Sequence, residues 1–483
     1  MNKNRAPVDR VLGWSVRHVL FPLQEFCKRH RTLAVLQQMQ TDERLDPGEL
    51  QYLLDGRLCS FLKDVTTTVP YYRELFEKLN LRAEDIQGVR DLPKIPILTK
   101  EVFRRNVTRM KSSRANGVRE FSTGGSTGEP LLFLLGTTRI SSDVASRMRA
   151  EAWWGVGIGD REIVIWGSPL ETHKQDWLRS IRDRVMRTRL LSAFEMSPEV
   201  MDGYLNMVER ARPVRIFGYP SSIAMLCQYA CQQGRSLRHL GVEAVFVTGE
   251  YLWDTWRQII SQTFGCAVAN GYGGRDSGFI AQECPAGGMH ITADRIVVEI
   301  IGDDGQRLPM GEVGEIIITH LDTPEMPFIR YATGDLGALS AKSCACGCRL
   351  PLLHCVEGRK TDFIVAPDGR IMHGLAFIYI LREIRGISQF RITQRHLRDF
   401  VVEVVKDTAY DASSEHEIRQ AISRRLRATV SVEIAYVPKI APAASGKHRY
   451  IVCDTTAPDI AVHLEAVGLH RAQVDEMKQM KVV

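Results

Sequence analysis

The chain lacks any run of 18 or more consecutive apolar residues, so the sequence predicts no membrane-spanning helix. It also lacks a strong charge of one sign. Its 63 Lys and Arg face 57 Asp and Glu, and the net charge of +6 demands no nucleic-acid partner. Heptads and low-complexity tracts are missing, which excludes a coiled coil. Residues 1–14 lack an apolar stretch followed by a cleavage site, so we expect no signal peptide.

What is present is the composition of a globular protein. Of the 483 residues 44% are hydrophobic and 8% aromatic, which is typical of a chain with one large and at least one smaller domain. The 11 cysteines are an odd number and are mostly scattered, which fits free thiols and predicts a cytoplasmic location. A dense cysteine cluster at Cys344, Cys346, Cys348 and Cys355 is the exception.

The order of apolar patterns divides the first three quarters of the chain into two segments. Residues 1–90 predict an N-terminal helical extension that packs on the large domain. Residues 91–358 alternate short strand-like runs, such as Glu162–Trp166, with helical stretches, and this alternation predicts an open α/β sheet. Within that segment, residues 296–319 indicate two strands joined by a turn at 304–305, and therefore a β-rich subdomain.

The pattern restarts after residue 358. Residues 359–454 predict a small C-terminal α+β domain, and residues 455–483 an appended helical tail. The predicted fold class is therefore α/β plus α+β: a large N-terminal α/β domain with a β-rich subdomain, and a small mobile C-terminal α+β domain.

Basic and apolar residues are interleaved near the N-terminus. Arg10, Arg17 and Lys28 alternate with residues such as Leu12 and Trp14. We favour the simpler interpretation, a packed surface helix with a solvated cationic face. The alternative is peripheral contact between this basic helix and an anionic membrane surface.

The first motif that carries chemistry is a loop at residues 121–130. Glycines turn backbone N–H groups inward and hydroxyls add donors, so such a loop suits phosphate oxygens, although it is also a common turn. The GK[ST] ending of a Walker loop is missing. The candidate phosphate-binding residues are Ser122, Thr123, Gly124, Gly125, Ser126, Thr127 and Gly128.

Two further motifs are predicted as turns. Residues 271–278 combine glycines with Tyr272 and Asp276, which suits a stacked ring and a bound cation. Residues 331–336 place Asp335 where one carboxylate accepts hydrogen bonds from two vicinal hydroxyls. A plain glycine-rich turn and a type I turn are the corresponding structural alternatives.

Two short basic motifs follow. Residues 358–362 include Arg359, and residues 445–449 include Lys447, which is either a surface lysine or a cation brought to developing phosphate charge.

Together these five motifs, in this order, resemble the adenylate-forming superfamily, which includes acyl-CoA ligases and adenylation domains. Within it the chain is most similar to the phenylacetate–CoA ligase branch, and particularly to its capsular-polysaccharide-associated members. The resemblance covers residues 120–450 and rests also on RYATGDLG, GMHITADRIVVEI and IFGYPSSIAML.

The resemblance implies a role for each matching residue. The 122–128 loop grips the ATP phosphates, Asp335 binds the ribose hydroxyls and Arg359 contacts ribose or phosphate. Lys447 acts at the carboxylate and α-phosphate, and Asp276 helps to hold Mg²⁺. The residues implied to line the adenine pocket are Gly249, Glu250, Gly271, Tyr272 and Gly273. Two departures from the family pattern are Arg275 in place of a threonine and Asp276 in place of a glutamate.

Cysteines and a histidine also predict a metal site. Five residues lie between Cys284 and His290, and one residue lies between Cys344 and Cys346. These are the ligand types and number of a structural tetrahedral Zn²⁺ site, and the same branch has a similar pattern. Cys348 is the main competing ligand. Unconnected packed thiols are the structural alternative.

These observations predict an ATP-dependent enzyme that converts a small-molecule carboxylic acid to an acyl- or aryl-adenylate and transfers the acyl group to CoA. The alternative is an amide-forming ligase or adenylyl transferase in surface-polysaccharide or secondary-metabolite biosynthesis, with an amine or hydroxyl acceptor and no CoA. Residues at the ends of predicted strands, including Trp166 and Tyr219, are candidates for the acid pocket, although core packing explains them equally well.

Overall fold

The computed structural model describes residues 7–122, 131–166, 182–193, 198–252, 254–359, 363–368, 371–373, 377, 381, 384–440, 450–454 and 457–466. It divides into two compact units. The larger comprises residues 1–123, 131–333 and 337–356, and the smaller comprises residues 124–130, 334–336 and 357–483.

Helices build the N-terminal part of the larger unit. They are α1 (Pro7–Ser15), the π-helical turn η1 (Val16–Leu20), α2 (Phe21–Lys28), α3 (Thr32–Asp42), α4 (Pro47–Thr68), α5 (Pro70–Lys78), η2 (Ala83–Asp85), η3 (Val89–Lys94) and α6 (Lys100–Arg105). Asp46 and Glu49 form a capping box that starts α4. Leu50, Leu54 and Leu58 recur every four residues on the buried face of α4, which explains why this helix packs on the core.

A single large sheet organises the rest of this unit. Its strand order is β10-β11-β12-β13-β9-β8-β7-β6-β5-β3-β4 among the described residues. The parallel part consists of β3 (Glu162–Trp166), β4 (Thr188–Ser192), β5 (Arg215–Gly218), β6 (Ala244–Thr248) and β7 (Ala267–Gly274). Strand β6 is buried along its whole length, as expected for a central parallel strand.

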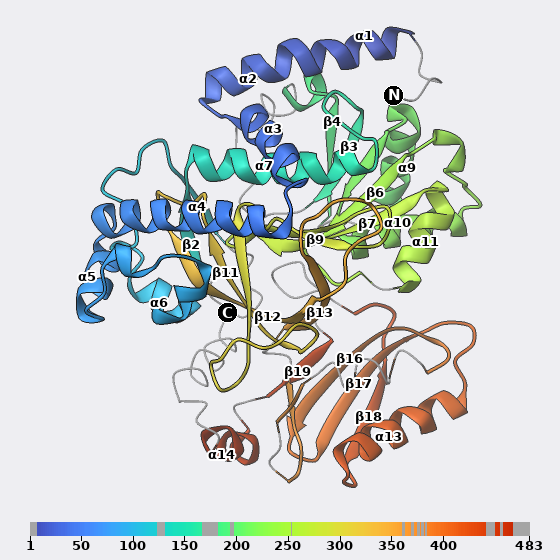
Figure 1. The fold of residues 1–483 in the computed structure, drawn as a ribbon. Coiled ribbons are helices and arrows are strands. Elements are labelled where there is room, and N and C mark those ends of the chain that lie inside the picture. The colour runs from blue at the N-terminus through green and yellow to red at the C-terminus, as the bar shows by residue number, and fades with distance from the viewer. Residues whose placement is uncertain are drawn as a thin grey trace. The chain divides into compact units, whose positions relative to one another are not determined.

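Helices cover this parallel part. They are α7 (Thr137–Trp153), α9 (Pro198–Ala211), α10 (Pro220–Gln232), η5 (Arg238–Leu240) and α11 (Asp254–Phe264), and Figure 1 shows α9, α10 and α11 beside β6 and β7. The apolar sides of α9, α10, η5 and α11 share one core with the strands, whereas Ile140 and Trp153 of α7 pack against the main core.

The remaining strands of the sheet are β8 (Gly278–Glu283), β9 (Met289–Ile291), β10 (Ile296–Ile301), β11 (Gly314–His320), β12 (Phe328–Ser340) and β13 (Leu352–Arg359). Strands β7, β8 and β9 pair antiparallel in sequence, and β10 pairs antiparallel with β11. A separate hairpin joins β1 (Arg119–Ser122) to β2 (Leu132–Leu135).

The smaller unit contains a four-stranded sheet in the order β18-β17-β16-β19. Its elements are β14 (Phe363–Val365), β15 (Ile371–His373), β16 (Ile387–His396), β17 (Asp399–Lys406), α13 (Ala412–Leu426), β18 (Ser431–Tyr436), β19 (Ile451–Cys453) and α14 (Pro458–Ala466). Helix α13 connects the parallel strands β17 and β18, which is the usual crossover for a parallel pair.

The predicted fold class is confirmed, with a large α/β sheet, a β-rich continuation and a small α+β unit. The predicted strand Glu162–Trp166 is β3, and the two strands expected at 296–319 are β10 and β11. No helix in the described ranges is long and apolar enough to span a membrane.

Candidate nucleotide site and candidate metal centre

The carboxyl ends of β6 and β7 bring two of the predicted adenine-pocket motifs together. Thr248 pairs with Gly271 in the parallel register, so Gly249 and Glu250 leave β6 beside the glycine motif of β7. Gly249 has a φ of +85°, and a Cβ added there would lie 3.0 Å from the ring of Tyr219. This glycine therefore allows both the left-handed backbone and the close packing of an aromatic ring.

Residues 271–274 lie inside strand β7, so the turn predicted within 271–278 is shorter than the motif. It occupies residues 275–277. A Cβ on Gly273 would lie 2.0 Å from the carbonyl oxygen of Gly278, because β7 and β8 pair here across a register shift. Glycine is therefore required by the hairpin itself.

Tyr272 extends from this strand toward β12. Its hydroxyl lies 3.4 Å from Oγ1 of Thr333, and Oγ1 of Thr333 donates to the carbonyl of Ile316 over 2.9 Å. The ring is half-buried and packs against the main core. This geometry fixes the ring plane while leaving part of the ring exposed.

Asp276 is buried, and both of its carboxylate oxygens accept hydrogen bonds. The hydroxyl of Tyr331 donates to Oδ2 over 2.6 Å, and the backbone N–H of Ser277 donates to Oδ1 over 3.0 Å. An ionised carboxylate has about four acceptor positions, so about two remain for a cation or water.

A buried arginine contacts the turn at residues 275–277 from inside the protein. The buried Arg139 donates to the carbonyl of Asp276 over 3.3 Å and to Asp143 over 2.9 Å. Burial raises the pKa of Asp143, but Arg139 and His320 outweigh it and hold that pKa below its usual value. Burial lowers the pKa of His320 itself. Asp143 is therefore the anion that neutralises Arg139 behind the turn.

The other predicted nucleotide residues are only partly described. Ser122 is the last residue of β1, and Arg359 is the last residue of β13. Asp335 lies in β12 after Gly334, whose φ is +81°, so the prediction of an isolated turn at 331–336 is wrong. Thr123, Gly124, Gly125, Ser126, Thr127, Gly128 and Lys447 lie outside the described residues.

Three aromatic side chains form a stack at the carboxyl ends of β3 and β5. Trp166 stacks on Tyr219 with ring centroids 4.1 Å apart, and on Phe217 with centroids 5.7 Å apart. The Arg147 guanidinium lies 3.9 Å from the Phe217 ring centroid. All three aromatic residues are half-buried. They form a flat apolar surface beside Gly249.

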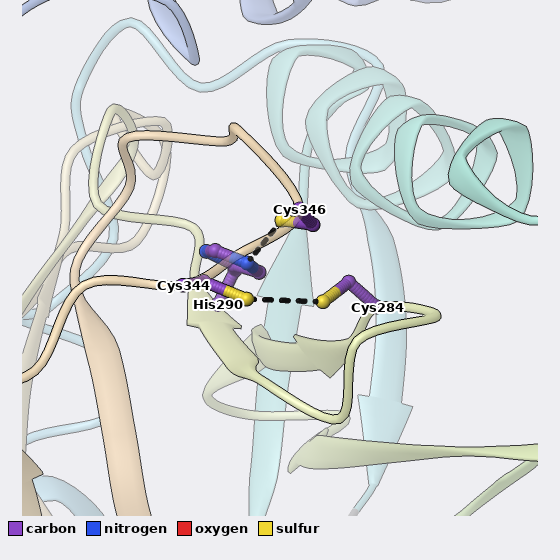
Figure 2. Close-up of side chains that lie close together, drawn as sticks. All are labelled: Cys284, His290, Cys344 and Cys346. Atoms are coloured by element: carbon purple, nitrogen blue, oxygen red, sulfur yellow. Dashed lines mark hydrogen bonds between the residues drawn. The ribbon is translucent and has the colours of Figure 1, made fainter.

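The four predicted metal ligands converge in the larger unit. Their ligand atoms all lie within 4.8 Å of one another. Figure 2 shows Cys284 facing Cys344, with 3.5 Å between the two Sγ atoms, and Nε2 of His290 lying 3.1 Å from Sγ of Cys346. All four groups are donors that Zn²⁺ prefers.

The spacing fits a tetrahedral ion. Zn–S bonds of about 2.3 Å and Zn–N bonds of about 2.0 Å place neighbouring ligand atoms roughly 3.5–3.8 Å apart. Nδ1 of His290 donates to the carbonyl of Leu350 over 3.1 Å, which leaves Nε2 for a metal. A Cβ on Gly288 would lie 2.7 Å from Sγ of Cys344, so the turn before His290 admits only glycine without a shift. Cys348 instead packs against the core.

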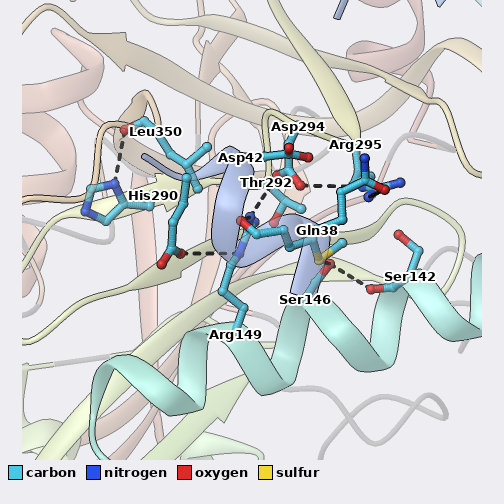
Figure 3. Close-up of polar contacts among 12 residues, drawn as sticks. Gln38, Asp42, Ser142, Ser146, Arg149, His290, Thr292, Asp294, Arg295 and Leu350 are labelled. Atoms are coloured by element: carbon cyan, nitrogen blue, oxygen red, sulfur yellow. Dashed lines mark hydrogen bonds and ion pairs between the residues drawn. The ribbon is translucent and has the colours of Figure 1, made fainter. Parts of the chain in front are cut away.

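A buried charge cluster lies near the candidate metal centre (Figure 3). Arg149 on α7 donates to Oδ1 of Asp294 over 2.9 Å and to the carbonyl of Met39 over 3.2 Å. The neighbouring Trp153 contacts the His290 ring edge-on, with centroids 5.4 Å apart. Helix α7 therefore contributes Arg149 to the charge cluster and packs Trp153 against the ring of His290.

The contacts of three residues in these sites were not predicted from the sequence. Tyr331 opens the 331–336 motif, but nothing local indicates that it reaches Asp276. Arg139 looks like an ordinary helical arginine. Phe217 could have been found, because it lies two residues before Tyr219 and alternate residues share one face of an extended chain.

The chain is similar to known proteins. Residues 364–454 match the model of the CapK C-terminal domain family. The chain is 22% identical to protein CapK of Staphylococcus aureus, over 84% of this chain and 89% of that protein. It is 24% identical to the phenylacetate-coenzyme A ligase of Thermus thermophilus, over 84% of this chain and 96% of that protein.

A solved structure shows the same fold. The crystal structure of 2-hydroxyisobutyryl-CoA ligase in the postadenylation state covers 89% of this chain and 94% of its own, with a TM-score of 0.69 and 18% identity. The predicted resemblance is therefore confirmed: this chain is a homologue of CapK and of the phenylacetate-coenzyme A ligases, and it has the fold of the adenylate-forming ligases.

Proposed function

We propose that this enzyme uses ATP to convert a carboxylic acid to an acyl- or aryl-adenylate and then transfers the acyl group to CoA. The observation that carries the proposal is the register of β6 and β7, which brings Gly249 and Glu250 beside the 271–273 motif in a chain related to phenylacetate-coenzyme A ligases over most of its length. Ligands of open α/β sheets bind at the carboxyl ends of strands, where these residues lie.

In the proposed adenylation, an uncharged aromatic residue would bind the adenine ring and a carboxylate would bind Mg²⁺. Tyr272, at the carboxyl end of β7 beside Gly249 and Glu250, would stack on the adenine ring. Asp276 would hold Mg²⁺ through the acceptor positions that Tyr331 and Ser277 leave open. Mg²⁺ neutralises phosphate charge when the carboxylate attacks.

The remaining roles stay with the residues that the motifs predict. The 122–128 loop would hold the ATP phosphates and Asp335 the ribose hydroxyls, with Arg359 nearby. Lys447 would supply positive charge at the α-phosphate, where charge develops. We also propose that the reaction takes place in the cytoplasm.

A flat acid fits the aromatic stack. Trp166, Phe217 and Tyr219 offer a stacking surface beside Gly249, next to the proposed adenine pocket. Rings stack face to face or offset at such distances, so we propose an aryl acid as the preferred substrate class.

Pyrophosphate exchange tests the function. The full-length protein with Mg²⁺ and ATP should exchange labelled pyrophosphate only when a suitable acid is added, and aryl acids should exceed fatty and amino acids. Lys447→Ala should lower the exchange rate at least about a hundredfold, while the exposed Lys439→Ala leaves it unchanged. Equal rates for Lys447→Ala and the wild type, or no exchange with any acid by the folded enzyme, would overturn the proposal.

A second candidate acceptor is the alternative that the sequence predicts. It is an amine or hydroxyl in surface-polysaccharide or secondary-metabolite biosynthesis, in place of CoA. Mass spectrometry of the products formed with CoA, and with amines or sugars in its place, separates a thioester from an amide or ester.

We propose that Cys284, His290, Cys344 and Cys346 bind one structural Zn²⁺. Four protein ligands leave no open position for substrate. Metal analysis of the purified protein should find one zinc per chain, and Cys346→Ser should lose it. Cys348→Ser is the matched control, because Cys348 is also in the cluster but packs against the core. Zinc retained by Cys346→Ser would contradict this ligand set.

A further inference from the structure

Large apolar side chains project into solvent along the first helical rod of the chain. The exposed set on α1, η1 and α2 is Val11, Leu12, Trp14, Val19, Leu23 and Phe26. Their exposed fractions run from 50% for Val19 to 82% for Phe26. Figure 1 shows this rod at the outer edge of the larger unit, beyond α3 and α7. An apolar set of this size on one element indicates an interaction surface.

The opposite side of the rod is firmly attached to the protein. Val16 and Phe21 are buried. Asp9 pairs with Arg161 and Arg187, and Glu25 accepts a hydrogen bond of 2.9 Å from Oγ1 of Thr32. The attachment fixes the rotation of the rod, so the exposed apolar side chains remain on the outside.

The rod is also positively charged where it meets solvent. Its acidic residues are Asp9 and Glu25, and both are engaged by partners within the protein. Arg17 is exposed, and Arg29 and Arg31 follow at the end of the rod and are exposed as well. Lys28 is half-buried near two other arginines, Arg119 and Arg182. Exposed apolar groups flanked by basic groups match the boundary of an anionic lipid layer.

We propose that the face formed by these six apolar residues and the flanking basic residues docks the enzyme on an anionic lipid surface. Trp14 and Phe26 enter the region between the headgroups and the acyl chains, and Arg17 and Arg29 contact lipid phosphates. A second copy of the chain is the less suitable partner, because a symmetric contact would bring the same basic residues together. The proposal is independent of the reaction that the enzyme catalyses.

Vesicle flotation with the full-length protein tests the proposal. The protein should float with vesicles of phosphatidylcholine and phosphatidylglycerol, should remain unbound with phosphatidylcholine alone, and should dissociate in high salt. The double variant Leu12→Glu with Phe26→Glu should bind at least about tenfold more weakly, because each substitution removes an apolar anchor. Met310→Glu is the matched control: Met310 is 64% exposed, lies in the same unit and should leave binding unchanged.

The basic component is tested in the same assay. Arg17→Glu should weaken binding to anionic vesicles, and Arg425→Glu on α13 should not. Circular dichroism and pyrophosphate exchange of every variant report whether it is folded, since none of these residues is assigned to catalysis. Binding that is absent for the wild type, or equal for the double variant and Met310→Glu, overturns the proposal. So does a wild-type dimer that the double variant converts to a monomer without any vesicle binding.

Discussion

At the scale of single residues, the structure explains how a short acid is positioned. Asp276 has one methylene fewer than the glutamate of the resembled family, and its Oδ2 accepts a hydrogen bond from a tyrosine that is fully buried. A buried hydroxyl that serves one carboxylate fixes its orientation. Tyr331 is therefore a positioning residue for the proposed Mg²⁺ ligand.

Tyr331→Phe removes this hydrogen bond without changing the ring. Leaving the buried carboxylate oxygen without its donor costs about 1–3 kcal/mol. We expect pyrophosphate exchange to fall about tenfold and the Mg²⁺ concentration for half-maximal rate to rise, because the carboxylate is no longer fixed. Tyr272→Phe is the control, since it removes a hydroxyl at 3.4 Å from its partner and keeps the stacking ring. An unchanged Mg²⁺ requirement in Tyr331→Phe would show that Asp276 needs no such support.

Gly249 offers a second test at this scale. Gly249→Ala places a methyl group 3.0 Å from Tyr219 at a φ of +85°. We expect a stability loss of about 1–2 kcal/mol together with a higher KM for ATP and acid. Gly241→Ala has a similar φ of +67° with open space around it, so it should lose similar stability and keep its KM values. Equal KM values in the two variants would show that Gly249 does not contribute to the binding of ATP or acid.

At the scale of elements, charges hold the amino ends of the parallel strands. Glu162 opens β3, Arg215 opens β5, and their side chains meet over 3.0 Å, with Arg147 of α7 as a third partner. Burial alone would raise the pKa of Glu162, but the two guanidinium groups outweigh it and hold that pKa at about 2. This cluster therefore connects the amino ends of β3 and β5 to α7.

The depressed pKa of Glu162 makes stability depend on pH. The charged carboxylate contributes stability above its unfolded pKa of 4.5, and this contribution is lost as the pH falls toward about 2. We expect a loss on the order of 3 kcal/mol from this group over that interval. Denaturant unfolding of the wild type, of Glu162→Gln and of the exposed Glu312→Gln measures it. The slope against pH should flatten only in Glu162→Gln, although that variant is less stable at neutral pH. Parallel slopes would contradict the assignment.

Elements were easier to predict than the contacts between them. The strand Glu162–Trp166 has a continuous apolar pattern and was placed correctly. The motifs at 271–274 and 331–336 look like turns because glycine is common in turns, yet both lie in strands. Gly273 allows the close pairing of β7 with β8, and Gly334 has a positive φ within an extended segment. A single sequence does not distinguish these uses of glycine from a turn.

At the scale of the whole molecule, the sequence predicted one long-range convergence and missed another. Cys284 and Cys346 were proposed as partners from residue types, and the structure places them within one set of ligand atoms. The hydrogen bond from Tyr331 to Asp276 spans 55 positions and has no local signal. The larger unit fixes such pairs through the order of its strands.

Removal of the proposed zinc from the full-length enzyme would distinguish a structural from a catalytic metal. A ligand bound at a thousandfold excess over its Kd stabilises the folded state by about 4 kcal/mol, so chelation should lower the melting temperature by several degrees. Below that temperature the chelated enzyme should keep its pyrophosphate exchange rate, because the four ligands leave no position for substrate. Immediate loss of exchange at low temperature, restored by zinc, would assign the metal a part in the reaction.

The contact of Arg149 with the backbone of Met39 has a practical consequence for anyone shortening the protein. Trimming the chain past α3 would remove one hydrogen-bond acceptor from the buried guanidinium of Arg149. Studies of the proposed docking face on the rod therefore need point substitutions in place of deletions.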